Sequence, residues 1–328
     1  MLELLVIAAV AAAAPAPGEL KTFKDWTVGC DNGLACQAVA LMPENNFETA
    51  TLVIKRGPEA NAPLEAWFNV REGAPAAVEI DARRVPLVAL KDGGYAPRAT
   101  AGFAALIADA RAIHLLDKGS KRIAPVSAVG AGAALLYIDD KQRRVGTTSA
   151  LVRRGAAKRV PPPPALPVVT VALPSAAKPP QLSSTAIARL RGEDGCGEAD
   201  REQASETHRL DASASLLMIP LACASGAYNF ASKAYTLDNR GRATPARFNS
   251  DSTTGDGNNT FLFNADWDPV TRRLATFFKG RGLGDCGSGH SWAWDGARFR
   301  LVKQEVMGEC RGSTDYITTW RARVVDRR

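Results

Sequence analysis

The chain has 328 residues, 46% of them hydrophobic and 23% charged, and its formal net charge is +7 at pH 7. This length suits two domains of ordinary size, each able to bury a core. The basic residues are scattered, with no run of five or more. They therefore indicate a solvated surface or an affinity for acidic polymers, and they argue against a nucleic-acid-binding protein.

An apolar leader opens the chain. Leu4 to Ala14 form a stretch about as long as the core of a signal peptide, and small residues and prolines follow it. We expect residues 1–16 to be a signal peptide, although Glu3 stands where such peptides carry positive charge, and a retained anchor is the alternative. No other long apolar stretch follows, so no transmembrane span is expected after cleavage.

The segment from residue 19 to 155 is predicted to be a β-rich N-terminal domain. Strand-like residues lead into Cys30, and Asn32-Gly33 forms a turn before Cys36, a pattern typical of a β-hairpin. Further strands are expected at 51–55, 66–70 and 111–116. Helices are expected near 103–108 and 127–153, the second capped by Ser127.

A proline-rich linker, residues 156–181, follows. Between residues 160 and 181 lie eight of the chain's 20 prolines. Proline fixes φ and lacks an amide donor, so a helix or a central strand is excluded here. The composition predicts an extended spacer, or a strap along a domain surface.

The remaining residues, 182–328, are predicted to be a C-terminal β-rich domain that begins with a helix near 184–191. Seven strand-like runs alternate with turn sequences such as Asp266-Trp267-Asp268-Pro269. The predicted fold class is mainly β with a few short helices (α+β), arranged as two antiparallel sandwich or barrel-like domains.

Six cysteines form three close-spaced pairs, and an even count behind an export signal indicates a disulfide framework. The pairs are Cys30–Cys36, Cys196–Cys223 and Cys286–Cys310. In a chain-entropy model, closing these loops stabilises the fold by about 9 kcal/mol in total. The framework predicts a periplasmic or secreted protein.

The segment 280–294 is the densest in residue types that bind ligands. We expect a glycine-rich loop, pinned by the third cysteine pair, that displays Arg281, Asp285 and His290 beside the indoles of Trp292 and Trp294. Strand alternation places both indoles on one face, where ligand stacking competes with core packing. The GxGxxG match here lacks a following helix, and a thiol or serine nucleophile lacks its usual context.

No metal or cofactor is expected. The three histidines show no helical i, i+4 pair, and there is no CxxC motif. One of them, His208, lies in a charged stretch that we expect to be a helix or a loop. The acidic loop 251–260 misses the spacing of a calcium-binding loop and has no closing glutamate.

Three blocks of sequence resemble an exported proteobacterial family, the domain of unknown function 1176. They are residues 23–31, residues 132–147, and residues 281–294 together with Cys310-Arg311-Gly312 and Trp320-Arg321-Ala322. The first half also resembles, through Trp26, Cys30 and Cys36, the invasion-associated locus B proteins.

The resemblance to the first family implies export and a disulfide-bonded build, and it brings no known catalytic residue. The resemblance also singles out a group of polar residues at the end of a helix. These residues are expected either to bind a ligand or to cap the end of the helix. The group comprises Asp139, Asp140, Gln142, Arg143 and Thr147, of which Asp139, Gln142 and Arg143 are the binding candidates.

The sequence thus favours a non-enzymatic envelope protein whose partner is an anionic envelope polymer or another envelope protein. One alternative is a periplasmic hydrolase that uses Asp285 or Asp139 with His290. Another is a secreted factor directed at host cells or at lysozyme.

Overall fold

The computed structural model describes residues 14–44, 46, 50–192, 204–249 and 261–327. Almost all of its regular elements are β-strands joined antiparallel, with three α-helices among the described residues. This confirms the predicted mainly-β class. None of the described helices is long and apolar enough to cross a membrane.

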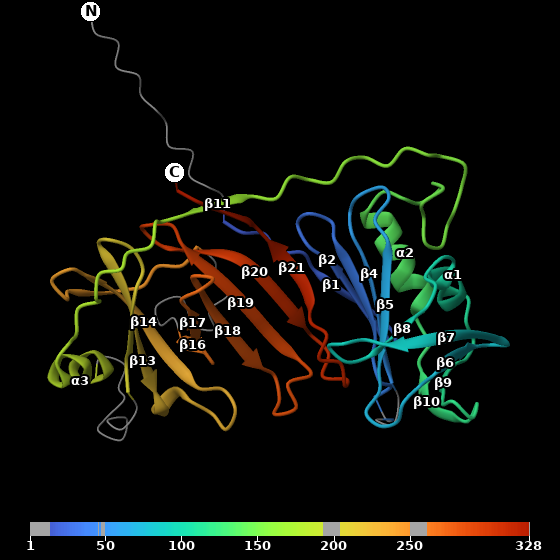
Figure 1. Ribbon diagram of the computed structural model, residues 1–328, viewed down its shortest axis with the longest axis horizontal. Coiled ribbons are helices and arrows are strands. Elements are labelled where there is room, and N and C mark those ends of the chain that lie inside the picture. The colour runs from blue at the N-terminus through green and yellow to red at the C-terminus, as the bar shows by residue number, and fades with distance from the viewer. Residues whose placement is uncertain (1–13, 45, 47–49, 193–203, 250–260, 328) are drawn as a thin grey trace, which may run out of the picture.

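The N-terminal half contains one ten-stranded sheet in the order β1-β2-β3-β4-β5-β8-β7-β6-β9-β10. Its strands are β1 (Leu20–Phe23), β2 (Trp26–Cys30), β3 (Cys36–Ala40), β4 (Thr51–Arg56), β5 (Leu64–Asn69), β6 (Ala77–Ile80), β7 (Arg83–Ala89), β8 (Tyr95–Pro97), β9 (Ile113–Leu116) and β10 (Arg122–Val126). Two helices, α1 (Phe103–Ala108) and α2 (Ala131–Lys141), pack together, and α2 covers β1, β2 and β3 (Figure 1).

The core of this half lies between the sheet and its helices. Trp26 is fully buried there, and its indole N–H donates to the main-chain oxygen of Ser127 (2.9 Å). The helix predicted over 127–153 is shorter than expected: α2 begins after Gly130 and ends at Lys141. Ser127 does not cap it, because Ser127 lies three residues before the N-cap residue, Gly130. Its hydroxyl donates to Asp25 Oδ2 (2.6 Å) and accepts the amide of Val129 (3.2 Å).

The C-terminal half is a sandwich of two five-stranded sheets. One sheet contains β12 (Glu206–Arg209), β13 (Ala214–Leu221), β14 (Ala231–Asp238), β15 (Ala243–Pro245) and β16 (Phe261–Phe263). The other contains β17 (Asp266–Asp268), β18 (Arg273–Lys279), β19 (Gly287–Trp294), β20 (Phe299–Met307) and β21 (Ile317–Arg321). The core between them is rich in aromatic side chains, and α3 (Ser184–Gly192) packs on the outer side of β13.

Two predictions for this half were wrong. Asp266-Trp267-Asp268 was expected to be a turn, but it forms β17, because Trp267 is buried in the core and draws the segment onto the sheet. The segment around His208 was expected to be a helix or loop, and it forms β12 instead.

The proline-rich segment 156–181, called the strap from here on, runs back across the molecule from the N-terminal to the C-terminal half (Figure 1). Within it, β11 (Val168–Val171) pairs in parallel with β22 (Arg323–Asp326). Val171 is buried with Ala293 and Val302, on the side of the β19–β20 pair away from the sandwich core. The segment therefore packs as a strap rather than hanging free as a spacer.

The two halves meet sheet to sheet. A buried apolar cluster fills the contact. The N-terminal half contributes Val39 of β3, Leu41 just after β3 and Val53 of β4, and the C-terminal half contributes Met307 and Ile317. Polar contacts surround the cluster, among them Gln37 Nε2 donating to the main-chain oxygen of Asp315 (3.0 Å). This junction is where the surface is hollowed between the halves.

Candidate functional site

Asp285 lies in the predicted glycine-rich loop, but its carboxylate is fully engaged. Arg281 Nε donates to Asp285 Oδ1 (2.7 Å), Arg281 also pairs with Oδ2, and the amide of Gly312 donates to Oδ2 (2.7 Å). These contacts, the Arg281 guanidinium first, hold the pKa of Asp285 below its usual value despite burial. The pair joins the loop to the Cys310–Gly312 turn, which makes it a structural element.

His290 is 7% exposed and stacks on Trp292, with ring centroids 5.4 Å apart. Burial lowers the pKa of His290 to about 4, so the ring is neutral at physiological pH. Among the residues that the structure describes, its Nε2 atom has no hydrogen-bond partner. Asp285 and His290 lie on the loop and the strand that follows it, but both of Asp285's oxygens are already engaged, so they do not form an acid–base pair.

Trp292 and Trp294 share a face of β19, as predicted, and that face is the sandwich core. Trp292 is fully buried and packs edge-on against Phe248 (5.3 Å between centroids). The indole N–H of Trp294 donates to Asp211 Oδ2 (2.6 Å). Both indoles therefore contribute to core packing. This is one of the two roles that the sequence left open, the other being ligand stacking.

The polar group at the end of α2 also has a structural task. Asp139 is fully buried and accepts the amides of Leu151 (2.7 Å) and Val152 (2.9 Å). The side-chain amide of Gln142 donates to main-chain oxygens, including that of Leu34 (2.8 Å). Arg143 is exposed, with a positive φ of 56°.

The residue that sequence reasoning missed here is Arg144. It is fully buried and donates to Gln142 Oε1 (2.9 Å), to Ser149 Oγ (3.1 Å) and to the main-chain oxygens of residues 57–60. Two adjacent arginines look alike in sequence. Only the left-handed turn at Arg143 sends one side chain outward and the next inward.

The structure contains the disulfides Cys30–Cys36 and Cys286–Cys310. The pair Cys196–Cys223 falls outside the described residues because Cys196 is not among them. Among the residues that are described, no group of three His, Cys, Asp or Glu side chains is placed to hold a metal ion.

The feature with open binding capacity is a groove at the junction of the halves, here called the junction groove. It consists of two cavities of about 520 and 220 Å³ that share Lys55. The larger is lined by Lys55, Lys279, Glu305, Asp315, Tyr316 and Phe277, among others. The smaller is lined by Arg56, Arg321 and Thr318, among others. The groove is thus built from β4, β18, β20 and β21.

Three acidic groups that line the junction groove are already partnered: Asp31, which Arg321 holds, Glu305 and Asp315. The fourth, Glu65, is exposed and stands opposite Lys55 in the β4–β5 pair. Glu305 forms an ion pair with Lys303. Asp315 accepts hydrogen bonds from Trp67 Nε1 (3.2 Å) and Asn69 Nδ2 (2.6 Å), while burial raises its pKa.

The basic groups are not neutralised in the same way. Lys55 lies over the Trp67 ring, 4.9 Å from its centroid, and among the described residues neither Lys55 nor Lys279 has an ion pair with a carboxylate. Arg56 is 8% exposed, and its Nε has no hydrogen-bond partner within the described part of the chain. Burial lowers the pKa of Arg56 to about 10, which leaves it charged at neutral pH.

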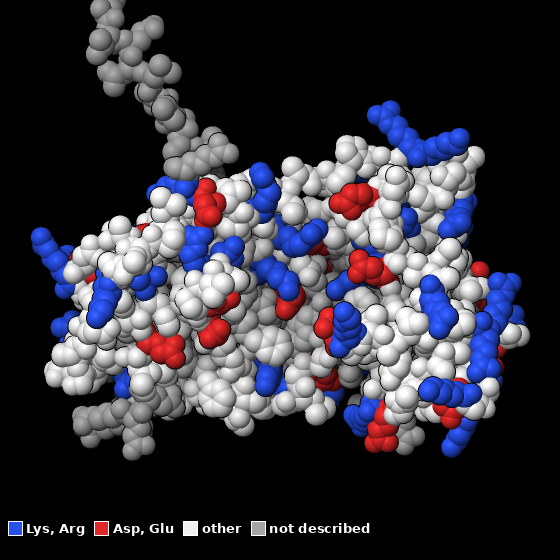
Figure 2. Space-filling model, viewed as in Figure 1, with Lys and Arg blue, Asp and Glu red and all other residues white. Residues whose placement is uncertain are grey.

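Two aromatic rings complete the larger cavity. Phe277 and Tyr316 lie 5.2 Å apart, and the Tyr316 hydroxyl donates to the main-chain oxygen of Gly284 (3.1 Å). Burial, with Asp285 and Glu305 nearby, raises the pKa of Tyr316 to about 12, so this hydroxyl stays protonated. Outside the groove, basic and acidic side chains are interspersed over both halves on the face shown in Figure 2.

No sequence pattern singled out the junction groove. Lys55-Arg56 ends a strand-like run and Asp315-Tyr316 begins another, 260 residues apart. These segments come together only because the two halves of the molecule contact each other. Such a contact leaves no recognisable pattern in the sequence around either segment.

A family model described as "Protein of unknown function (DUF1176)" matches residues 20–323. The chain is 32% identical over 340 residues to the uncharacterized protein YpfG of Escherichia coli (strain K12), which covers 95% of this chain and 94% of that protein. No solved structure matches the chain.

Proposed function

The chain belongs to the DUF1176 family of unknown function, and we propose that it is an exported envelope protein that binds an anionic envelope polymer in the junction groove without transforming it. The observation that carries the proposal is the group of cationic side chains there that form no ion pair. Among the described residues Lys55 and Lys279 pair with no carboxylate, although Asp315 lies close enough to interact electrostatically with Lys55, and the Nε of Arg56 has no hydrogen-bond partner. Glu305, in contrast, pairs with Lys303.

The chemistry of the groove fits a polymer that carries both charge and sugar rings. Ammonium groups at the edge of a low-dielectric cavity attract carboxylate or phosphate groups. Aromatic rings such as Phe277 and Tyr316 offer apolar faces beside them. A groove between two packed sheets is also open enough for a chain to lie along it.

Export is part of the proposal and is supported by the apolar leader and by the disulfides, which persist in oxidising compartments. Binding rather than hydrolysis is supported by the engagement of the candidate catalytic groups. Both oxygens of Asp285 and of Asp139 accept structural hydrogen bonds, and His290 is buried and neutral.

The test is co-sedimentation with purified peptidoglycan sacculi and with lipopolysaccharide aggregates, in low and in high salt. We expect binding to at least one of them that weakens as salt screens the charges. The double variant Lys55→Ala/Lys279→Ala should bind at least tenfold more weakly. A matched control, Lys118→Ala/Lys121→Ala, removes the same charge from exposed positions of the N-terminal half and should bind as the unchanged protein does.

Equal weakening in both double variants would point to nonspecific surface charge and overturn the junction groove as the site. Binding of neither polymer at any salt concentration would overturn the polymer as the ligand.

A further inference from the structure

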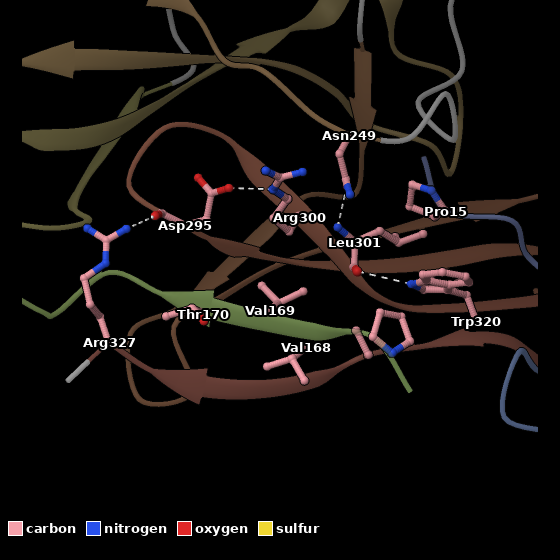
Figure 3. A pocket seen from close by; sticks show the side chains of 12 residues that line it. Pro15, Val168, Val169, Thr170, Asn249, Asp295, Arg300, Leu301, Trp320 and Arg327 are labelled. Carbon is pink, nitrogen blue, oxygen red and sulfur yellow. Dashed lines mark hydrogen bonds and ion pairs between the residues drawn. The ribbon is translucent and has the colours of Figure 1, made fainter. Parts of the chain in front are cut away.

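A second cavity, of about 320 Å³, lies between the strap and the sheet that contains β20 and β21. We call it the strap pocket. Its lining includes Val168 and Thr170 of β11, Arg300 and Leu301 of β20, Trp320 of β21 and Pro15 (Figure 3). It shares no lining residue with the junction groove.

One wall of the strap pocket is an open strand edge. Arg323 N donates to Pro167 O (2.8 Å) and Arg327 N donates to Val171 O (3.0 Å), so alternate residues of β11 face β22. In an extended strand the residues between them direct their N–H and C=O groups to the opposite edge. Val168 and Thr170 therefore present their main-chain groups on the side where Asp295 and Arg300 lie in Figure 3.

Just beyond the end of β11, the same edge of the strap forms a hydrogen bond within the protein. Ala172, the next residue on that side, donates its amide to the main-chain oxygen of Trp294 (3.1 Å). The edge is thus closed by the protein at Ala172 and open at Val168 and Thr170. Among the described strands, β11 pairs with β22 alone.

Pro15 and Trp320 line the other end of the strap pocket (Figure 3). The segment that contains Pro15 is anchored by Gly18, whose amide donates to Thr319 O (2.8 Å). The indole N–H of Trp320 donates to the main-chain oxygen of Leu301 (3.2 Å). Trp320 therefore offers its ring, rather than its N–H group, to a ligand of the strap pocket.

We propose that the strap pocket binds an extended, proline-containing peptide of a partner protein, which adds a strand to the free edge of β11 and sets its proline against Trp320. In this mode main-chain hydrogen bonds supply affinity and the side-chain contact supplies selectivity. Exposed edges are usually blocked in proteins, whereas among the described residues no strand pairs with this edge of β11.

The test uses the intact protein and a fluorescently labelled hexapeptide, Pro-Ala-Val-Ala-Val-Ala, in an anisotropy titration. Two further peptides carry N-methyl groups, one at the alanines and one at the valines. Because alternate amides of a strand point to opposite edges, one methylated peptide should lose at least tenfold in affinity and the other should bind nearly as the parent does. Replacing the peptide's proline by alanine should also weaken binding.

A protein variant completes the test. The groove variant Lys55→Ala/Lys279→Ala should bind the peptide unchanged, which separates the two sites. Equal binding of both methylated peptides would overturn strand addition, and no binding at millimolar peptide would overturn the site. Neither result depends on whether a variant folds.

Discussion

Arg321 at the end of β21 donates through Nε to Asp31 Oδ2 in the β2–β3 turn, and so joins two residues 290 positions apart. Asp31 is 3% exposed and also accepts the amides of Gly33 (2.8 Å) and Ala35 (3.0 Å). A second pair, Arg311 with Asp25, spans the same junction. The junction that forms the groove is therefore held by ion pairs at its rim and by an apolar cluster inside.

Loss of the Arg321 side chain should destabilise the protein. Arg321→Ala leaves the buried Asp31 carboxylate without its cation, and since Arg321 is itself partly exposed we expect a loss of about 1–2 kcal/mol in the free energy of unfolding. Urea denaturation measures it. Arg122→Ala breaks the exposed pair with Glu79 and should cost less than about 0.5 kcal/mol. Equal losses in the two variants would contradict the role assigned to the junction.

Asp139 should be a structural residue. Asp139→Ala removes the acceptor of two buried amides, so we expect a loss of about 2–3 kcal/mol and faster hydrogen exchange at Leu151 and Val152. Asp140→Ala, at the exposed neighbouring position, serves as the control and should leave both measurements nearly unchanged. If Asp139→Ala instead abolished binding to sacculi or lipopolysaccharide while stability stayed intact, the binding role suggested by the sequence would be restored.

Sequence patterns predicted the elements whose formation depends on residues close together in the chain. The hairpin at Asn32-Gly33 and the helix at 103–108 appear where expected, because turn residues and apolar spacing act within a few positions. Burial of Trp292 and Trp294 on one face likewise follows from strand alternation. The sequence did not predict the parallel pairing of β11 with β22, since it joins segments 155 residues apart.

The candidate site was less predictable for the same reason. The residues chosen for their chemical type, Asp285 and His290, turned out to be an engaged carboxylate and a buried ring. Lys55 and Lys279, which line the groove, are ordinary strand-end lysines in the sequence. Only the contact between the two halves gives them a shared cavity.

Replacing Arg144 should destabilise the protein far more than replacing its neighbour Arg143. Arg144→Ala leaves several main-chain oxygens without a donor in the interior and is expected to cost at least about 3 kcal/mol of unfolding free energy. Arg143→Ala should cost little, because that side chain is exposed. Thermal denaturation of the two variants side by side gives the comparison, and a larger loss for Arg143→Ala would contradict the assignment.

His290 should make stability depend on pH. Its pKa is about 4 in the folded protein and about 6.5 when unfolded, so the unfolded chain binds the proton more strongly. The neutral ring's contribution is complete above pH 6.5 and is lost as the pH falls toward 4, by up to about 3 kcal/mol. The difference in unfolding free energy between the unchanged protein and His290→Leu should therefore shrink or reverse over that range. A difference that stays constant from pH 7 to 4 would refute this.

The most direct test of the junction groove is lysine footprinting of the unmodified protein with and without bound sacculi or lipopolysaccharide. Acetylation rates are read by mass spectrometry at Lys55 and Lys279, with Lys118 and Lys121 as references in the same molecule. The account predicts that the ligand slows acetylation of Lys55 and Lys279 several-fold and leaves the two references unchanged. Protection at the reference lysines alone, or bound ligand with Lys55 and Lys279 as reactive as before, would contradict it.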